Sequence, residues 1–362
     1  MSEAVASTEA DRAESIRMIR DSAAAVAPRG GDTKRVRALR FTDPGFDPAV
    51  LRQMGELGWI GLRVPESAGG AGLGMGEMCA LAEELGAGLA PEPLIPSALS
   101  AAVLAAVAED RATLARILAG EIYAPIAWQE RPDTLDVPGS PDAPRRFIPQ
   151  AAGAALFLVP VREGGRIALY EMPREGADLA IERTQDGGNY GTLRLALGQA
   201  KRVADDVGAV LDLALDEAAL TTAAYLLGVM EKSFDLTLNY LKTRQQFGRV
   251  IGSFQALQHR AADLKIQLGL TRASVESAAA ALDAGAEGAA RRAAVSRAKA
   301  RAAEASMLVT RQVIQLHGGI GYTDEYDAGL YLRKAMVLAN QFGSATLHRR
   351  RFMKDAPEGA EE

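Results

Sequence analysis

Two short segments of the chain combine side chains and glycines that could bind an anionic ligand. The first, residues 243–255, reads TRQQFGRVIGSFQ. The guanidinium of Arg244 or Arg249 could meet a phosphate with two parallel hydrogen bonds, and Gln255 would open a helix whose first backbone N–H groups are unpaired. Phe247 lies between these polar groups. A solvated connection between two helices would have the same composition, so the residues alone leave both interpretations open.

The second segment, residues 315–326, reads QLHGGIGYTDEY. Its three glycines exceed the single one that usually ends a helix, and they allow left-handed backbone and the close approach of a ligand. His317 is one of only three histidines, and none of them has the spacing of a metal site, so no metal is expected. The single cysteine, Cys79, lies in an apolar run, which predicts a buried thiol.

The hydrophobic pattern predicts the elements that must position these segments. Asp47 and Pro48 form the start signal of a helix that ends near residue 58, and a second helix is predicted over 75–89. The glycine-rich run 69–74 predicts a loop, and phosphate binding is not expected there because the lysine and hydroxyl residue of a P-loop are missing. Residues 1–123 are therefore predicted to form an N-terminal helical domain.

Between residues 124 and 204 the pattern changes to short apolar runs. They cover 155–161, 167–171 and 192–196, with Pro, Gly and Asp between them. Glu163–Gly165 separates two of the runs and is typical of a hairpin turn. This stretch predicts a small middle β-domain that leans on the helices to either side.

Helical periodicity returns over residues 205–362. Four long segments, at 205–240, 254–284, 288–316 and 330–340, predict a C-terminal four-helix bundle. Abundant alanine in the second and third favours close contact with another helix or another subunit. The predicted fold class is α+β, in the order helical domain, β-domain, helical bundle.

The composition excludes several classes of function. A hydrophobic fraction of 48% and a charged fraction of 24% in 362 residues are typical of a chain with large buried cores. The net charge, 41 − 46 = −5, offers no overall attraction for nucleic acid or an anionic membrane. No run reaches the roughly 18–20 uncharged apolar residues of a membrane span, and the start lacks the features of a secretory signal. A cytoplasmic protein is expected.

Taken together, these motifs resemble those of the acyl-CoA dehydrogenase family. The resemblance lies in RQQFGRVIGSFQ at 244–255, in QLHGGIGY at 315–322, and in GWIGLRVPE at 58–66 with the acidic EELG at 83–86. It covers nearly the whole chain and implies the same order of helical, β and helical domains.

The resemblance implies FAD held between subunits and a reaction that converts an acyl-CoA to an enoyl-CoA, with electrons passed on to an acceptor. Arg244, Phe247 and Gln255 match the family's contacts to FAD. The same resemblance assigns to the cofactor site the backbone segment Gln315, Leu316, His317, Gly318 and Gly319, together with Ser344 and Thr346.

The chain departs from the family at the catalytic base. One of the family's two positions for the essential carboxylate falls on Phe342, and the other falls on Ala218. Glu217 is one residue away, but one step along a helix turns a side chain by about 100°. Glu217 is therefore expected to be a solvated carboxylate near the start of its helix, and its role as base stays an alternative.

The middle domain departs as well. Residues 127–132 and 146–149 replace the stretches with which the family contacts the flavin ring, and neither matches the family pattern. The hypothesis that follows is a subunit of a heteromeric, α2β2-type dehydrogenase whose base and flavin-ring contacts come from a paralogous partner. Such relatives tend to act on bulky acyl chains, including those of steroid degradation. The alternatives are a self-sufficient homo-oligomer that uses Glu217 and a scaffold protein that has lost FAD.

Overall fold

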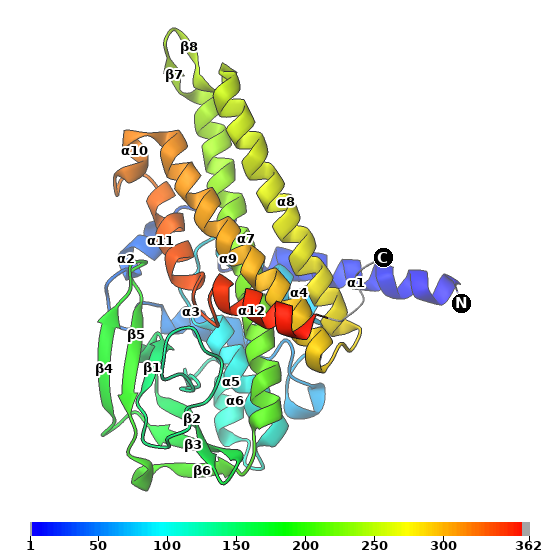
Figure 1. Cartoon of the computed structure of the whole chain (residues 1–362), viewed down its shortest axis with the longest axis vertical. Coiled ribbons are helices and arrows are strands. Elements are labelled where there is room, and N and C mark those ends of the chain that lie inside the picture. The colour runs from blue at the N-terminus through cyan, green and yellow to red at the C-terminus, as the bar shows by residue number, and fades with distance from the viewer. Residues whose placement is uncertain (1, 357–362) are drawn as a thin grey trace.

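The computed structural model describes residues 2–356 and consists of a base of short helices and strands from which long helices rise (Figure 1). The helices of the first part are α1 (Ser2–Ala23), α2 (Lys34–Leu39), α3 (Pro48–Glu56), α4 (Met75–Ala87), α5 (Leu94–Val107) and α6 (Ala112–Leu118). The predicted start of α3 is confirmed, because Asp47 caps it by accepting a hydrogen bond from the Ala49 backbone N–H. Between α3 and α4 the glycine-rich run forms a loop, as predicted.

The middle region contains two small antiparallel sheets. Its strands are β1 (Arg145–Pro149), β2 (Leu156–Glu163), β3 (Arg166–Pro173), β4 (Asp178–Arg183), β5 (Asn189–Arg194) and β6 (Lys201–Ala204). One sheet has the order β1-β5-β4 and the other β2-β3-β6. The predicted hairpin is the β2–β3 turn, where Glu163 pairs with Arg166 and both intervening glycines have positive φ. The hydrophobic runs predicted β2, β3 and β5 and missed the other three strands of these sheets.

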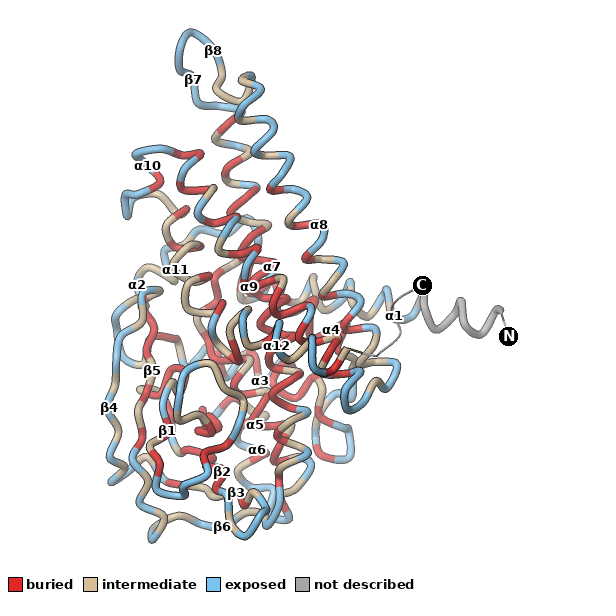
Figure 2. The backbone as a smooth tube through the Cα atoms, viewed as in Figure 1, coloured by how far each residue is buried: buried red, intermediate tan, exposed pale blue. Residues whose placement is uncertain are grey.

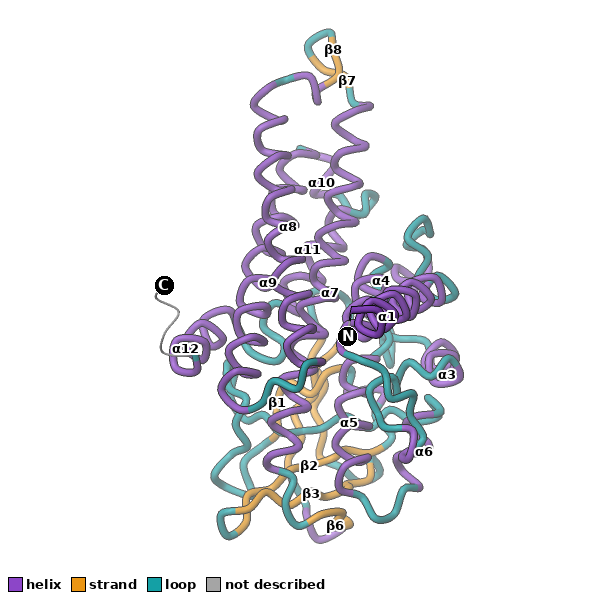
Figure 3. Tube along the Cα trace, turned by 90° about the vertical axis from the view of Figure 1, so that its right-hand side faces the viewer, coloured by secondary structure: helices purple, strands orange, loops and turns teal. Residues whose placement is uncertain are grey.

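The last part is a bundle of long helices. Its elements are α7 (Gly208–Thr243), the hairpin β7 (Gln245–Gln246) and β8 (Arg249–Val250), α8 (Gln255–Asp283), α9 (Gly288–His317), α10 (Gly319–Tyr322), α11 (Ala328–Leu338) and α12 (Ala345–Asp355). The four predicted segments correspond to α7, α8, α9 and α11. In Figure 3 the long helices rise side by side from the end of the molecule that carries the strands, with β7 and β8 at the far tip. The predicted order of helical, β and helical parts is confirmed.

Helix α7 is the central element of the molecule. An 18-residue window within it is apolar enough for a membrane span by composition, but 89% of that window is buried by protein (Figure 2). It crosses α4 where Gly228 faces the carbonyl of Glu83, and a Cβ atom on Gly228 would lie 1.9 Å from that oxygen. The close approach of the two backbones joins the bundle to the N-terminal helices.

Charged side chains reinforce the same junction. Glu83 on α4 receives hydrogen bonds from Arg20 on α1 and from Arg272 on α8, and Arg272 also pairs with Glu231 on α7. Cys79 lies buried on α4, and burial raises the pKa of its thiol. The N-terminal helices and the bundle therefore provide one continuous framework for the candidate site.

Candidate functional site

The first candidate segment forms the outermost tip of the bundle. Arg244 ends α7, and the hairpin β7–β8 turns through Phe247 and Gly248, both at positive φ. The Phe247 side chain is 90% exposed. Arg249 lies over the ring of Phe254, 4.0 Å from its centroid, and holds the far side of the hairpin. A tip that presents an aromatic ring and arginines to its surroundings is typical of a contact made outside the chain.

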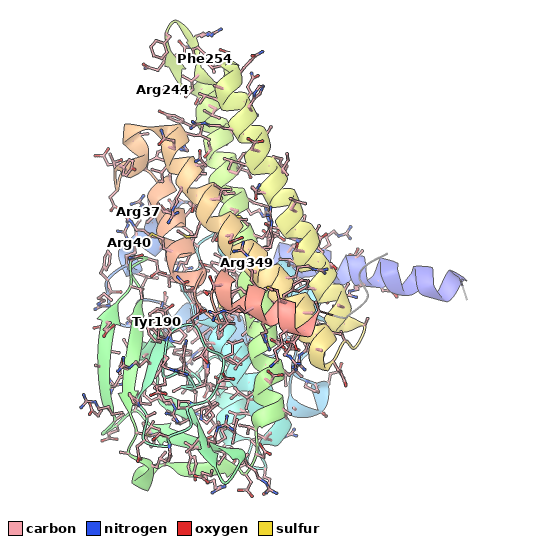
Figure 4. The ribbon with its side chains drawn as sticks, in the orientation of Figure 1. Arg37, Arg40, Tyr190, Arg244, Phe254 and Arg349 are labelled. Atoms are coloured by element: carbon pink, nitrogen blue, oxygen red, sulfur yellow. The ribbon has the colours of Figure 1, made fainter. Side chains whose placement is uncertain are left out.

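The cofactor residues predicted at this tip face outward. Arg244 and Gln255 are both exposed, and Gln255 is the first residue of α8. Within residues 2–356 the structure gives no hydrogen bond or ion pair for the guanidinium of Arg244. Its donors, together with the open N-terminus of α8, therefore fit the phosphates of a ligand such as FAD. Figure 4 places Arg244 and Phe254 at the opposite end of the bundle from Tyr190 in the middle region.

The second candidate segment ends α9. Gly318 adopts φ 64° and ψ −142°, a conformation that only glycine adopts readily. Gln315, Gly318 and Gly319 are exposed, whereas Leu316 and His317 are buried. The last two could therefore contribute to a ligand site only through their backbone.

The imidazole of His317 makes hydrogen bonds and aromatic contacts within this end of the bundle. Its Nδ1 lies 2.8 Å from the Val313 carbonyl and its Nε2 lies 3.2 Å from the Tyr326 hydroxyl. Burial lowers the pKa of His317. The imidazole also lies 4.6 Å from the Tyr240 ring, centroid to centroid, and Tyr240 is one helical turn before Arg244. The two candidate segments, far apart in sequence, thus lie at the same end of the molecule.

Phe342, at the first position expected for a base, lies in the turn between α11 and α12. Its buried ring stacks on Trp128 with the planes 8° apart and the centroids 5.5 Å apart. Both rings line a cavity of about 430 Å³ between the middle region and α11. The indole N–H of Trp128 is buried without a hydrogen-bond partner among the described residues. The aromatic pair therefore forms an apolar part of the cavity wall, against which a ligand could pack.

The sequence indicated the region of Trp128 only as a departure from the family pattern. It did not indicate which other residues line the cavity beside Trp128. Tyr190 and Gln341 border both this cavity and a neighbouring one of about 80 Å³. The ammonium of Lys334 on α11 contacts the Asp186 carboxylate there, 2.5 Å away, and lowers the pKa of that carboxyl although burial opposes the shift. One signal was available: Trp128 is one of only two tryptophans in the chain.

The remaining predicted cofactor residues follow Phe342. Ser344 caps α12 by accepting a hydrogen bond from the Leu347 backbone N–H, 3.2 Å away. Ser344 and Thr346 also border an open groove along α9, α11 and α12, which meets the cavity of Phe342 at Ser344 and Asn340. These two residues therefore lie together with Phe342, and Figure 4 shows that Arg349, in the same helix, is remote from the tip that carries Arg244.

The sequence predicted that Glu217 is a solvated carboxylate, and the structure contradicts this prediction. Glu217 is only 15% exposed and forms an ion pair with Arg63, whose side chain also approaches Asp283 at 3.6 Å. The prediction was wrong because Arg63, 154 residues earlier, folds back against this side of α7. Glu217 and Ala218 line a cavity of only about 20 Å³, separate from the cavity of Phe342. Over residues 2–356 no group of histidine, cysteine and acidic side chains could hold a metal ion.

Comparisons with known proteins follow the same division of the chain. The family model for "Acyl-CoA dehydrogenase, N-terminal domain" matches residues 13–120, and that for "Acyl-CoA dehydrogenase, C-terminal domain" matches residues 208–356. Acyl-CoA dehydrogenase IpdE2 of Mycolicibacterium smegmatis is 30% identical over 336 residues, which are 90% of this chain and 94% of the relative. The IpdE2 of Mycobacterium tuberculosis is 31% identical over 324 residues, which are 89% and 91% of the two chains.

Solved structures show the same similarity. A variant of the Tcur3481-Tcur3483 steroid ACAD aligns with a TM-score of 0.84 and 29% identity, covering 97% of this chain and 100% of the other. The ChsE4-ChsE5 complex from Mycobacterium tuberculosis aligns with a TM-score of 0.82 and 26% identity, covering 96% and 97%.

Proposed function

The chain belongs to the acyl-CoA dehydrogenase family, oxidoreductases that act on acyl-CoA, and from this premise we propose that it is one subunit of a heteromeric FAD-dependent enzyme. A paralogous partner would supply the catalytic base and most contacts to the flavin ring. This chain would supply Arg244, Gln255 and the backbone of Gln315–Gly319 to the cofactor.

One observation carries the proposal: neither position that the family uses for its base can remove a proton here. Phe342 is held in a stack with Trp128, and Ala218 lines a cavity of about 20 Å³. The neighbouring carboxylate of Glu217 is engaged by Arg63 and borders that small cavity instead of the larger one. The larger cavity is lined by one carboxylate, that of Asp133, which accepts hydrogen bonds from the Ser344 N–H and from Arg350. We therefore infer that the carboxylate that removes the α-proton comes from elsewhere.

The tip supports a shared cofactor site. Its two arginines, Gln255 and Phe247 are exposed, and none of them lines the cavities described above. They would hold the phosphates and neighbouring groups of an FAD bound largely by another subunit. The chemistry that FAD supplies when bound is acceptance of a hydride from the β-carbon, while a base takes the α-proton and leaves an enoyl-CoA.

The solved relatives agree with a heteromer and with a class of substrate. Two of them are named for pairs of proteins, and one of these is named a steroid ACAD. We infer a CoA thioester with a bulky or cyclic acyl group, as in steroid degradation, and an electron-transfer protein as the acceptor. This substrate class follows from the relatives alone.

Co-expression with a paralogue tests the proposal. The chain is purified alone and together with a candidate partner, and the flavin absorption band is followed while octanoyl-CoA or cyclohexanecarbonyl-CoA is added. We expect a colourless chain alone and a yellow complex that bleaches with one of the thioesters.

Each other outcome supports a different interpretation. A chain that is yellow alone and bleaches would be a self-sufficient enzyme, and Glu217 would again be the candidate base. A complex that never contains flavin, whatever the partner, would point to a scaffold protein that keeps the fold and has lost the cofactor.

A further inference from the structure

We propose that Lys299, a lysine buried in α9, is a positioning residue for the cavity beside Trp128. It fixes the turn between α11 and α12 and, through that turn, holds the Phe342 ring against Trp128. The inference goes beyond the proposed function, because it applies whichever subunit supplies the base.

Lys299 is fully buried, and all the hydrogen bonds of its side chain go to one short stretch of backbone. Its Nζ donates to the carbonyls of Ala339 at 3.0 Å and Gly343 at 2.9 Å, and more weakly to that of Leu338 at 3.4 Å. At the C-terminus of α11 the Ala339 carbonyl has no other partner among the described residues, whereas the Leu338 carbonyl also accepts from the Gln341 N–H at 3.3 Å. A positive charge is favoured there by the helix dipole as well. Burial lowers the pKa of Lys299 to about 7, and in the protonated form all three protons of the ammonium group have acceptors.

Within the turn the Gln341 N–H donates to the Leu338 carbonyl at 3.3 Å, but this hydrogen bond does not fix Phe342 or Gly343. Phe342 and Gly343 both adopt positive φ, of 55° and 98°, and for a phenylalanine this conformation is unfavourable. Two further contacts meet the same turn: His348 Nε2 lies 2.8 Å from the Phe342 carbonyl, and the Ser344 N–H donates to Asp133 at 3.1 Å. Lys299 is the contact that joins the two ends of the turn, from Ala339 to Gly343.

The hydrogen bonds of Lys299 to the turn also affect the shape of the cavity. The turn contributes Asn340, Gln341 and Phe342 to the cavity of about 430 Å³, so its position sets the shape of that wall. Without Lys299 the carbonyls of Ala339 and Gly343 would lose their hydrogen-bond donor, and we expect the turn to move so that water can reach them. Phe342 would then leave Trp128, and solvent would reach the indole.

Trp128 provides a direct test, because the only other tryptophan is Trp59. A Trp59→Phe chain carries Trp128 as its single tryptophan, and acrylamide quenching of the selectively excited tryptophan emission reports how exposed that ring is. In this background, Lys299→Met should raise the quenching constant by about threefold or more and shift the emission to the red, at a temperature where the chain is still folded. Circular dichroism checks that the helices remain.

Arg272→Met in the same background is the matched control. Arg272 is a cation on a bundle helix that is less buried than Lys299, and its partners Glu83, Glu231 and Glu276 do not line the cavity. It should lower the melting temperature and leave the quenching of Trp128 unchanged. Equal quenching in the Lys299→Met chain and its parent, or an equal rise in the control, would overturn the proposal.

A second variant keeps the test decisive if Lys299→Met fails to fold. Lys299→Gln is polar and retains two N–H donors for the carbonyls, although it loses the charge and one bond length of reach. We expect an intermediate rise in the quenching of Trp128 with this variant. A folded Lys299→Gln chain with parental quenching would contradict a positioning role.

Discussion

Arg244 is placed to bind a ligand that its own chain does not enclose. It ends the longest helix at the tip of the bundle, and its guanidinium has no partner within residues 2–356. If it holds a cofactor phosphate, Arg244→Ala removes charge-assisted hydrogen bonds worth about 1.5–3 kcal/mol, or roughly ten- to a hundredfold in affinity. Flavin content per complex after gel filtration should fall. As a control, Lys242→Ala removes an exposed charge one residue before the end of α7 and should leave the flavin content unchanged. Normal flavin content in the Arg244→Ala variant would refute a role of Arg244 in binding the cofactor.

Glu217 separates the two enzyme hypotheses. Because its carboxylate is paired with Arg63, Glu217→Gln should leave acyl-CoA-driven dye reduction by the assembled complex unchanged. The same change should lower the free energy of unfolding by about 1–3 kcal/mol, since Arg63 loses its main partner in a partly buried place. Glu276→Gln, on an exposed carboxylate 64% accessible, should cost far less. A rate loss of about a hundredfold with normal flavin content would make Glu217 the base and this chain the catalytic one.

At the scale of elements, the crossing of α4 and α7 depends on glycine. A Cβ at Gly228 would overlap the Glu83 carbonyl, which belongs to the rigid backbone of α4. Gly228→Ala should therefore destabilise the fold by about 3 kcal/mol or more, measured by urea unfolding. Gly269 lies within α8 with no atom near its would-be Cβ, so Gly269→Ala should stabilise by up to about 1 kcal/mol. Equal effects of the two changes would contradict the close approach of α4 and α7.

The junction of α11 and α12 predicts a dependence of stability on pH. Burial lowers the pKa of His348 to about 3, whereas an unfolded histidine has a pKa near 6.5. Between these values the unfolded chain binds a proton that the folded chain does not, so stability is complete above about pH 6.5 and falls on acidification toward pH 3. The loss from this residue amounts to roughly 4 kcal/mol.

Unfolding curves between pH 4 and 7 measure this dependence. His348→Gln should flatten the pH profile because its side chain does not titrate, at the cost of lower stability at neutral pH. His259→Gln, on an exposed position of α8, should keep the slope of the original chain. An unchanged slope in the His348 variant would show that other groups cause the acid sensitivity.

At the scale of the whole molecule, the bundle presents apolar surface that residues 2–356 do not cover. Ile266 and Leu270 on α8 are 57% and 52% exposed, and Leu308 on α9 is 45% exposed. With an outward-facing cofactor tip, these side chains predict a subunit interface. Light scattering should give at least a dimer for the chain alone and a two-plus-two tetramer with its partner. A stable, FAD-loaded monomer at micromolar concentration would contradict this.

The sequence by itself determined the order of the three parts and identified the two candidate segments, whose position at the same end of the molecule only the structure shows. Both depend on local patterns: helical periodicity predicted α7, α8, α9 and α11, and residue types at fixed spacing predicted exposed donors at Arg244 and Gln255. Helix α12 was missed because it is short and strongly charged, with only His348 and Asp355 buried, so it shows little hydrophobic periodicity.

Tertiary structure alone decided what the side chains near the cavities do. Glu217 pairs with Arg63, Phe342 stacks on Trp128, and Lys299 clamps the turn after α11. Each of these contacts joins residues from distant parts of the sequence, and no local spacing specifies which of them meet. The packing of whole helices and sheets brings them together, and burial then sets which charges are paired and which rings are stacked.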